Sequence, residues 1–268
     1  MKGRPNAELS RSLETIDRLT QRDEKMNEFF MAASHQLKSP VAIMQWCLQT
    51  ILESGAIDAK SRDLVLKTVN QAGIMNQLIT DMLHVFRLTY RQEEKAQYYS
   101  FVDINATLVE VFAQYEVVAH QRHVHLVKGP SEVLPPVYVE ESFLKQAMIN
   151  LVDNAIKYSD SGDEVTVSTH LAKDNFAEII VEDQGIGIPE AEQSQLFKEF
   201  FRGEEAQART YEGTGLGLVL VKHVAEEFGG SIVVHSTLHK GSRFILRLPT
   251  AEVSEKMPLI PGRKIGKE

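Results

Sequence analysis

Asn150, Asn154 and Lys157 form the first group of residues whose types and spacing could do chemistry. The two asparagines are four residues apart and the lysine follows three later, so a helix would present all three on one face. Amide oxygens suit a hard cation such as Mg²⁺, and an ammonium group suits phosphate oxygens. A solvated helix face explains the same spacing, so this group alone does not establish a site.

Two glycine-bearing loops follow in the sequence. Asp183, Gly185 and Gly187 come directly after a predicted strand, where the carboxylate offers an acceptor for an exocyclic amine and the glycines let the backbone approach a flat ligand. A short Gly-x-Gly is also compatible with a plain turn. Residues 213–217, Gly-Thr-Gly-Leu-Gly, open a predicted helix whose N-terminal amides could bind phosphate. The second loop lacks the Gly-Lys-Ser/Thr ending of a P-loop and a Rossmann β-α-β context, so both of those assignments fail.

His35 is the candidate nucleophile of the first third of the chain. One imidazole nitrogen can attack phosphorus while a neighbour holds the other nitrogen. Pro40 lacks an amide hydrogen and crowds the carbonyl of Gln36, so it bends the helix one turn after the histidine. A lone histidine on a helix is usually a surface residue, so its assignment depends on the surrounding sequence.

The region from about residue 9 to residue 91 predicts two long antiparallel helices. Apolar residues recur at helical spacing in residues 26–37 and 65–86, and a short turn separates the stripes. Asp58 or Ser61 is expected to cap the second helix. Two helices cannot bury an apolar stripe on each, so we expect a second copy of the chain to complete a four-helix bundle.

The sequence after residue 95 alternates between strand and helix patterns. Strands are predicted over 98–102, 123–127, 137–139, 165–171, 177–182, 231–235 and 242–248, and helices over 104–121, 141–158 and 218–228. Asp103 is expected to cap the first of these helices. The fold class is therefore α+β: an antiparallel helical hairpin followed by an α/β sandwich with a mixed sheet, one face of which helices cover. The expected boundaries are 1–95 for the hairpin, 96–250 for the sandwich and 251–268 for a flexible tail.

Composition excludes several classes of protein. The net charge of −8 disfavours a dedicated nucleic-acid binder. The single cysteine, Cys47, excludes an intrachain disulfide, suits a reducing cytosol and is expected to fill the bundle core. No apolar run approaches the roughly 18 residues of a membrane helix, and the N-terminus lacks the apolar core of a signal peptide. We therefore expect a cytoplasmic location, either as a free protein or as the cytoplasmic part of a membrane-bound sensor.

The order of these motifs resembles a known family. An asparagine-bearing helix, a strand followed by Asp-x-Gly-x-Gly, and Gly-Thr-Gly-Leu-Gly resemble the ATP-binding fold shared by histidine kinases, gyrase B, Hsp90 and MutL. Residues 196–203, Leu-Phe-Lys-Glu-Phe-Phe-Arg-Gly, look like the phenylalanine box of histidine kinases. Residues 34–40, Ser-His-Gln-Leu-Lys-Ser-Pro, resemble the phosphoacceptor box, whose usual form is Ser-His-Glu-Leu-Arg-Thr-Pro. The resemblance covers about residues 20–250 and is to the sensor histidine kinases of two-component systems.

The resemblance implies ATP and Mg²⁺ as cofactors and a role for each motif. Asn154, with Asn150 beside it, would hold Mg²⁺, Lys157 would add positive charge, and Asp183 would accept the adenine amino group. A lid over about residues 189–214 would close on the phosphates. The other implied nucleotide-binding residues are Tyr158, Gly185, Gly187, Arg202, Gly213, Thr214, Gly215, Leu216 and Gly217.

The implied reaction is attack of His35 on the γ-phosphate, followed by transfer to an aspartate of a response-regulator receiver domain. The implied partners are a second copy of the chain and that receiver domain, with no nucleic acid, and with a membrane only through a sensor region that this chain does not contain. Two other hypotheses stay open: a dimeric nucleotide-binding scaffold without phosphotransfer, and a serine kinase or ATPase on the same fold. The His-x-x-x-Ser-Pro box favours the histidine kinase over the latter.

The chain departs from the family pattern at Gln36, where an acidic residue is usual. An amide oxygen can hold the imidazole tautomer but cannot take up a proton, and general-base help is typically worth ~10²–10⁴-fold. We therefore expect slow autophosphorylation. Ser39 lies on the same helical face as His35 and could orient a water that dephosphorylates a bound regulator, so the output can be biased towards phosphatase activity.

Overall fold

The computed structural model describes residues 38, 41–53, 58–90, 98–205 and 214–254. It divides into two compact units, Met1–Arg91 and Gln92–Glu268. The sequence-based boundary at residue 95 lies four residues further along the chain. His35, Gln36, Ser39 and Gly213 lie outside the described residues, as do residues 255–268 of the predicted tail.

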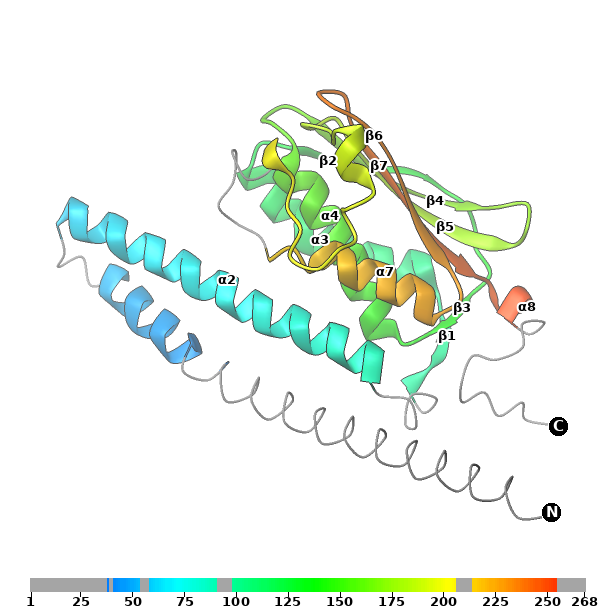
Figure 1. Ribbon diagram of the computed structural model, residues 1–268, viewed down its shortest axis with the longest axis horizontal. Coiled ribbons are helices and arrows are strands. Elements are labelled where there is room, and N and C mark those ends of the chain that lie inside the picture. The colour runs from blue at the N-terminus through cyan, green and yellow to red at the C-terminus, as the bar shows by residue number, and fades with distance from the viewer. Residues whose placement is uncertain (1–37, 39–40, 54–57, 91–97, 206–213, 255–268) are drawn as a thin grey trace, which may run out of the picture. The chain divides into compact units, whose positions relative to one another are not determined.

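The described part of the first unit consists of two helices, one over residues 41–53 and α2 over Ala59–Tyr90 (Figure 1). The Asp58 carboxylate accepts the backbone N–H of Ser61 at 2.7 Å and its hydroxyl at 3.2 Å, so the predicted cap is confirmed. The Asn76 side-chain amide donates to Oε1 of Gln45 at 2.7 Å. This bond fixes one point of the pairing between the two helices.

The hairpin buries only part of its apolar surface. Among the residues of the hairpin that the structure describes, the buried apolar ones are Val41, Ala72, Ile79 and Leu83. Large apolar side chains stay exposed on both helices, namely Ile43, Met44, Trp46, Ile51, Leu64, Leu66, Met75 and Met82. Cys47 is exposed as well, so the expectation that it fills the core is wrong for the single chain. Its position on the helix directs it away from the face that Val41 buries.

The second unit contains a five-stranded mixed sheet and a two-stranded sheet. The larger sheet has the order β2-β4-β5-β7-β6, formed by His125–Ser131, Glu164–Leu171, Phe176–Asp183, Gly241–Pro249 and Ser231–Thr237. In this sheet, as far as the structure describes it, β2 and β4 pair in parallel and the other neighbouring strands pair in antiparallel orientation. The smaller sheet pairs β1, Ser100–Val102, with β3, Val137–Val139, in antiparallel orientation.

Three helices cover one face of the larger sheet (Figure 1). They are α3, Ile104–Gln121; α4, Glu141–Tyr158; and α7, Gly217–Glu227. Between them and the sheet lies an apolar core that includes Leu108, Leu144, Leu151, Ile179, Leu220 and Leu246, all at or below 1% exposed. Burial of these side chains is the main stabilising contribution in the unit. The predicted sandwich, with helices on one face, is confirmed.

Local signals explain where the elements begin. Asp103 caps α3 as predicted, because its Oδ1 accepts the N–H groups of Asn105 and Ala106 at 2.8 and 3.3 Å. The predicted start of β2 at residue 123 is wrong by two residues. His123 has φ +56° and its carbonyl accepts the N–H of Gly162, so it belongs to the turn after α3. A short helix, α5, spans Glu190–Gln193.

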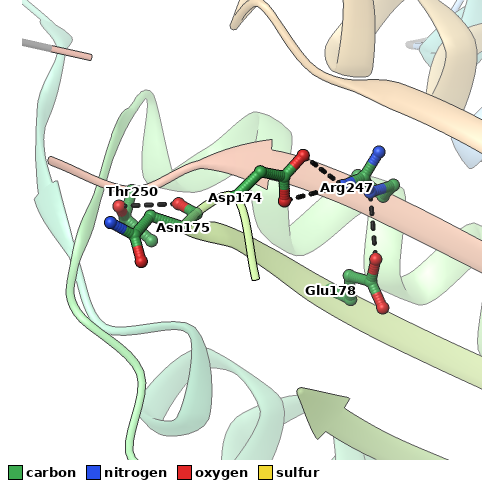
Figure 2. Close-up of polar contacts among 5 residues, drawn as sticks. All are labelled: Asp174, Asn175, Glu178, Arg247 and Thr250. Carbon is green, nitrogen blue, oxygen red and sulfur yellow. Dashed lines mark hydrogen bonds and ion pairs between the residues drawn. The ribbon is translucent and has the colours of Figure 1, made fainter. Parts of the chain in front are cut away.

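The predicted tail begins too early. Its first four residues form α8, Ala251–Ser254, in which Ser254 is 2% exposed. Thr250 contacts the turn between β4 and β5, donating its hydroxyl to the Asn175 carbonyl at 2.8 Å (Figure 2). In the same view Arg247 donates to both oxygens of Asp174 at 3.0 and 2.9 Å and to Glu178 at 2.9 Å. These contacts hold the end of β7 against the β5 strand and its preceding turn.

No helix among the described residues combines the length and the apolar character that a membrane crossing needs.

Candidate functional site

The C-terminal half of α4 carries four of the predicted site residues. Asn150 is 8% exposed, whereas Asn154, Lys157 and Tyr158 are half-buried. The Lys157 ammonium lies 5.0 Å from the centre of the Tyr158 ring. Helical geometry therefore presents the two amides and the ammonium along one side of α4, as the spacing predicts.

A hydrogen bond joins α4 to the second glycine-bearing loop. The Asn150 amide nitrogen donates to the carbonyl of Gly217, the first residue of α7, at 3.1 Å. The Asn150 amide oxygen in turn accepts from Nε2 of Gln146 at 3.2 Å. Both ends of the Asn150 amide thus have protein partners, so this side chain holds the start of α7 against α4.

The loop after β5 packs against the end of α4. The Ile186 N–H donates to the Tyr158 carbonyl at 3.1 Å. A Cβ atom at Gly185 would fall on that same carbonyl, so only glycine fits there. Gly187 has φ +66°, and a Cβ at this position would contact the Thr237 carbonyl. The two glycines are therefore required by the protein's own backbone, and their contact with a flat ligand stays a prediction.

Asp183 lies half-buried where β5 ends. Its Oδ1 accepts the N–H groups of Gly185 at 3.0 Å and Ser242 at 3.1 Å. Burial raises the pKa of the Asp183 carboxyl to about 6, against the lowering effect of these two bonds, and the charge of Asp163 raises it further. Among the described residues, no group donates to Oδ2. That oxygen is the acceptor this site offers to a ligand.

The described part of the second loop, Thr214–Gly217, is fixed by a local turn. The Thr214 hydroxyl accepts the Leu216 N–H at 3.2 Å, and Leu216 is 4% exposed. The backbone of Phe200 lies so close to Gly215 that a Cβ there would contact it. The loop therefore lies beside the segment that resembles a phenylalanine box.

Arg202 belongs to the same neighbourhood. Burial raises the pKa of the Tyr158 hydroxyl, and the positive charge of Arg202 opposes that rise, which places the guanidinium within electrostatic range of the phenol. Phe200 is 65% exposed and has φ +59°. The structure thus brings Arg202, Tyr158, Asn150, Asp183 and the residues of both loops together around α4, whereas His35, Gln36, Ser39 and Gly213 lie outside the described residues.

Three supporting residues carried no role in the sequence interpretation. Ser242 donates its N–H to Asp183, Gln146 orients Asn150, and a Cβ at Gly241 would contact the Asp183 carbonyl. For Gln146 the signal is local, because it lies four residues before Asn150 on α4. For Ser242 and Gly241 the signal is the strand pairing, since Asp183 is the register partner of Ser242 in the β5–β7 ladder. That register is a long-range property, and the sequence alone does not specify it.

The assembled groups suit an anionic, amine-bearing ligand. The carboxylate acceptor lies at one end of the site, and the ammonium and guanidinium groups supply positive charge. No three His, Cys, Asp or Glu side chains gather as a metal site within the described ranges. A divalent cation here would therefore rely on amide oxygens together with oxygens of a bound ligand.

Comparison with known proteins identifies the family. Residues 139–252 match the family described as histidine kinase-, DNA gyrase B-, and HSP90-like ATPase. The chain is 33% identical over 223 residues to the sensor-like histidine kinase SenX3 of Mycobacterium tuberculosis, a match that covers 83% of this chain and 53% of SenX3. The chain belongs to the histidine kinase family. The sensor histidine kinase RppB of Synechocystis is 31% identical to this histidine kinase chain over 231 residues, covering 86% of the chain and 50% of RppB.

The likeness extends beyond the ATPase-like region of the histidine kinase. The second unit has 177 residues, so a match of 223 residues necessarily includes part of the first unit. The adaptive-response sensory kinase SasA of Crocosphaera subtropica is 30% identical over 257 residues, covering 91% of the chain and 66% of SasA. The chain spans about half the length of the first two of these curated relatives.

Solved structures share the architecture. ShkA, whose full-length crystal structure contains AMPPNP, superposes with a TM-score of 0.65 at 25% identity, covering 83% of this chain and 45% of ShkA. The Acinetobacter baumannii histidine kinase AdeS has a TM-score of 0.56 at 24% identity and matches 81% of this chain and 98% of its own. The second likeness supports the fold alone.

Proposed function

We propose that this chain binds ATP in the site around α4, transfers the γ-phosphoryl group to His35, and passes it to an aspartate of a response regulator. The observation that carries the proposal is that both glycine-bearing loops bond to α4, the helix that carries Asn150, Asn154 and Lys157. Asn150 of α4 bonds to Gly217, and Tyr158 of α4 bonds to Ile186. The family membership and the AMPPNP bound to ShkA support a nucleotide as the ligand.

Asp183 accepts the exocyclic amine of adenine. Its Oδ1 already binds two backbone N–H groups, so Oδ2 is the oxygen for the ligand. Lys157 and Arg202 supply positive charge to the phosphates, and N–H groups of the loop at the start of α7 contact phosphate oxygens. Tyr158, Gly185, Gly187 and the loop residues 213–217 shape the walls of this site.

Asn154 is the metal ligand of the proposal. The half-buried amide makes no hydrogen bond to any described residue, so its oxygen is available, whereas that of Asn150 accepts from Gln146. Mg²⁺ prefers oxygen ligands and is commonly completed by substrate phosphates and water. When bound it would neutralise charge that develops on the phosphates. Asn150 supports the site by positioning α7.

His35 is the phosphoacceptor. A lone pair on an imidazole nitrogen forms the bond to the γ-phosphorus, the bond to the β–γ bridging oxygen breaks, and ADP leaves with that electron pair. Gln36 cannot accept the ring proton, which leaves to solvent. The SasA match covers 91% of this chain, so the likeness to a sensory kinase includes part of the unit in which His35 lies.

A second copy of the chain and a receiver domain are the proposed partners. The exposed apolar side chains of the hairpin, such as Trp46 and Leu64, give the physical reason for dimerisation. The dimer should scatter light as twice the chain mass of 30.2 kDa at micromolar concentration. The cytoplasmic location expected from the sequence stays part of the proposal.

Labelling with γ-³²P ATP tests the function. The unsubstituted chain should acquire acid-labile, base-stable label, and His35→Ala should acquire none while binding nucleotide as before. His125→Ala is the matched control, because His125 is an exposed histidine on β2 and should leave labelling unchanged. Label that persists in His35→Ala would refute the assignment.

The same experiment separates the alternatives. A chain that binds ATP and dimerises but never acquires label would be a nucleotide-binding scaffold. An acid-stable label would instead indicate a serine kinase. No observation favours either alternative over the histidine kinase hypothesis.

A further inference from the structure

Asp183, Ser242 and Ser236 form a row across neighbouring strands of the larger sheet, β5, β7 and β6. Asp183 is the register partner of Ser242 in the β5–β7 pair, and Ser242 is the register partner of Ser236 in the β6–β7 pair. Directly opposite residues of an antiparallel pair point to the same face of the sheet, with Cβ atoms about 4.5–5.5 Å apart. Ser242 lies an even number of residues before Leu246, so the row is on the face that carries the apolar core. The two serine hydroxyls therefore lie beside the carboxylate that is the proposed acceptor for the base.

The Ser236 hydroxyl is fully engaged by its neighbours. Its Oγ accepts the N–H of Ile188 at 2.8 Å, donates to the carbonyl of Gly241 at 2.9 Å, and lies 3.0 Å from Oγ of Ser242. A hydroxyl has one hydrogen and two lone pairs. Since a carbonyl only accepts and an amide N–H only donates, Ser236 gives its hydrogen to Gly241 and one lone pair to Ile188. The hydrogen of the bond between the two serines therefore comes from Ser242.

Ser236 is held in place by the segment that follows β5. The side-chain amide of Gln193, in α5, donates to the carbonyl of Ser236 at 3.0 Å and to that of Ile188 at 3.1 Å. The bond from the Ile188 N–H to the Ser236 hydroxyl joins the same two residues a second time. On the other side of the pair, Ser242 is 8% exposed and its N–H donates to Oδ1 of Asp183. The Ser236 oxygen is therefore a fixed acceptor for the Ser242 hydroxyl.

The direction of the Ser242 hydroxyl matters because the Asp183 carboxylate is its other neighbour in the row. That carboxylate already accepts the Ser242 N–H through Oδ1, and no described residue donates to Oδ2. A serine whose N–H binds one oxygen of a carboxylate can donate its O–H to the other oxygen after rotation about its Cα–Cβ bond. Hydrogen bonds to ionised acceptors are stronger than those between neutral groups. Without Ser236 as its acceptor, the Ser242 hydroxyl would therefore turn to Asp183.

We propose that Ser236 is a positioning residue for nucleotide binding, because it takes the hydrogen of Ser242 and so keeps Oδ2 of Asp183 open for the amine of the base. This role rests on the proposed function, in which that oxygen is the acceptor for adenine. Ser236 does not contact the nucleotide in this role and acts through Ser242. When Ser236 is lost, the Ser242 hydroxyl competes with the adenine amine for the same oxygen, and ATP binds more weakly.

A merely structural serine would behave differently. If Ser236 only held the loop after β5, its loss would weaken ATP binding because the bonds to Ile188 and Gly241 are lost. Removal of the Ser242 hydroxyl as well would then bring no recovery. In the proposed role, the second substitution removes the competing donor, so part of the lost affinity returns. The double variant therefore distinguishes the two roles.

Titration of the full chain with ATP measures these effects. Ser236→Ala should weaken ATP binding at least about fivefold, because Ser242 then donates to Asp183. Ser242→Ala should bind ATP within about twofold of the unsubstituted chain, because Oδ2 stays open. The double variant, Ser236→Ala with Ser242→Ala, should bind ATP at least about threefold more tightly than Ser236→Ala. Ser231→Ala is the matched control, because Ser231 is an exposed serine on the same strand and should leave binding unchanged.

A second readout needs no nucleotide. Carboxyl ¹³C resonances report the pKa of Asp183 in the free chain, and the Asp183→Asn variant identifies its signal. Burial and the charge of Asp163 raise this pKa to about 6, against the two backbone bonds that lower it. A hydrogen bond from Ser242 to the carboxylate favours its charged form, so the pKa of Asp183 should fall in Ser236→Ala and recover in the double variant.

Several results would overturn the role of Ser236 alone. They are an ATP affinity of Ser236→Ala equal to that of the unsubstituted chain, a double variant that binds no better than Ser236→Ala, and a pKa of Asp183 that Ser236→Ala leaves unchanged. A clear loss of affinity in Ser242→Ala would overturn it as well, since Ser242 would then bind the base directly. An unsubstituted chain that does not bind ATP would refute the proposed nucleotide site together with this role. A chain that binds ATP but acquires no label would refute phosphoryl transfer alone.

Discussion

Replacing Asp183 with asparagine should make the nucleotide-free protein more stable at neutral pH while weakening its binding of ATP. The pKa of this carboxyl rises from its ordinary value of 3.8 to about 6 because the group is buried. A raised pKa in the folded state means that the carboxyl's stabilising contribution is complete below about pH 3.8 and is lost as the pH rises through about 6. At pH 7.5 the loss is about 3 kcal/mol, at 1.36 kcal/mol for each pKa unit.

Asparagine removes the charge but keeps the acceptor for the N–H groups of Gly185 and Ser242. Its own NH₂ group then needs solvation, so we expect a net gain of roughly 1–2 kcal/mol at pH 7.5. For a unit of this size the gain corresponds to a rise in the unfolding midpoint of roughly 2–8 °C. The same change replaces the adenine acceptor at Oδ2 with a donor or a weaker acceptor, so ATP affinity should fall by about 1–3 kcal/mol, or roughly 5- to 150-fold.

Calorimetry of the full chain at two pH values tests the stability argument, and titration with ATP tests the binding argument. At pH 4.5 the native carboxyl of the unsubstituted protein is largely protonated, so the charge-dependent part of the difference should shrink from about 3 to about 1 kcal/mol. The net gain in stability should therefore disappear or change sign at that pH. Asp174→Asn is the matched control. The bond from Arg247 lowers the pKa of Asp174, so its loss should destabilise the protein and leave ATP binding unchanged. A loss of stability in Asp183→Asn at pH 7.5, or an unchanged ATP affinity, would refute the reasoning.

Three further changes have defined outcomes. Gln36→Glu should raise the autophosphorylation rate at least about tenfold in a time course of labelling, if the missing carboxylate limits the reaction. An equal or lower rate would show that glutamine suits the site. Asn150→Ala removes the bond to Gly217 and should weaken ATP binding by about 1–3 kcal/mol in a titration, whereas unchanged affinity would mean that α7 holds its position unaided. Arg247→Met removes the bonds to the exposed Asp174 and to the more buried Glu178, so we expect a loss of about 1–2 kcal/mol and a thermal midpoint lowered by roughly 2–8 °C. An unchanged midpoint would show that these bonds contribute nothing to stability.

Helices and strands with a clear periodicity were predictable almost to the residue. The bounds of α4 coincide with the prediction because its apolar positions keep one face, and the Asp103 cap defines the start of α3. The predicted start of β2 was two residues too early. His123 fits a strand pattern in the sequence, but it adopts a positive φ in the turn after α3. The tail was misjudged at 251–254, where burial of Ser254 depends on contacts with elements far away in the sequence.

The types of the site residues were predictable, but their partners were not. Local spacing puts Asn150, Asn154 and Lys157 on one side of a helix, since that depends only on helical geometry. The bond from Asn150 to Gly217 spans 67 residues, and the bond from Ser242 to Asp183 spans 59. Such pairs depend on the packing of α7 against α4 and on the register of β7 with β5. No local sequence pattern specifies the helix packing or the strand register.

The glycines of the loop after β5 have a structural reason that the sequence alone does not reveal. Their presence suggested room for a flat ligand, yet at Gly185 the nearest atom to an added Cβ is the carbonyl oxygen of Tyr158, and at Gly187 it is that of Thr237. The loop is therefore pressed between the end of α4 and the end of β6. This packing holds the N–H of Gly185 where Asp183 accepts it, which leaves Oδ2 as the free acceptor. Under the proposed function, the glycines act on the nucleotide indirectly, because they fix the orientation of the Asp183 carboxylate. An added methyl group at residue 185 would disturb the fold and the acceptor together, whereas Asp183→Asn changes the acceptor and leaves the packing in place.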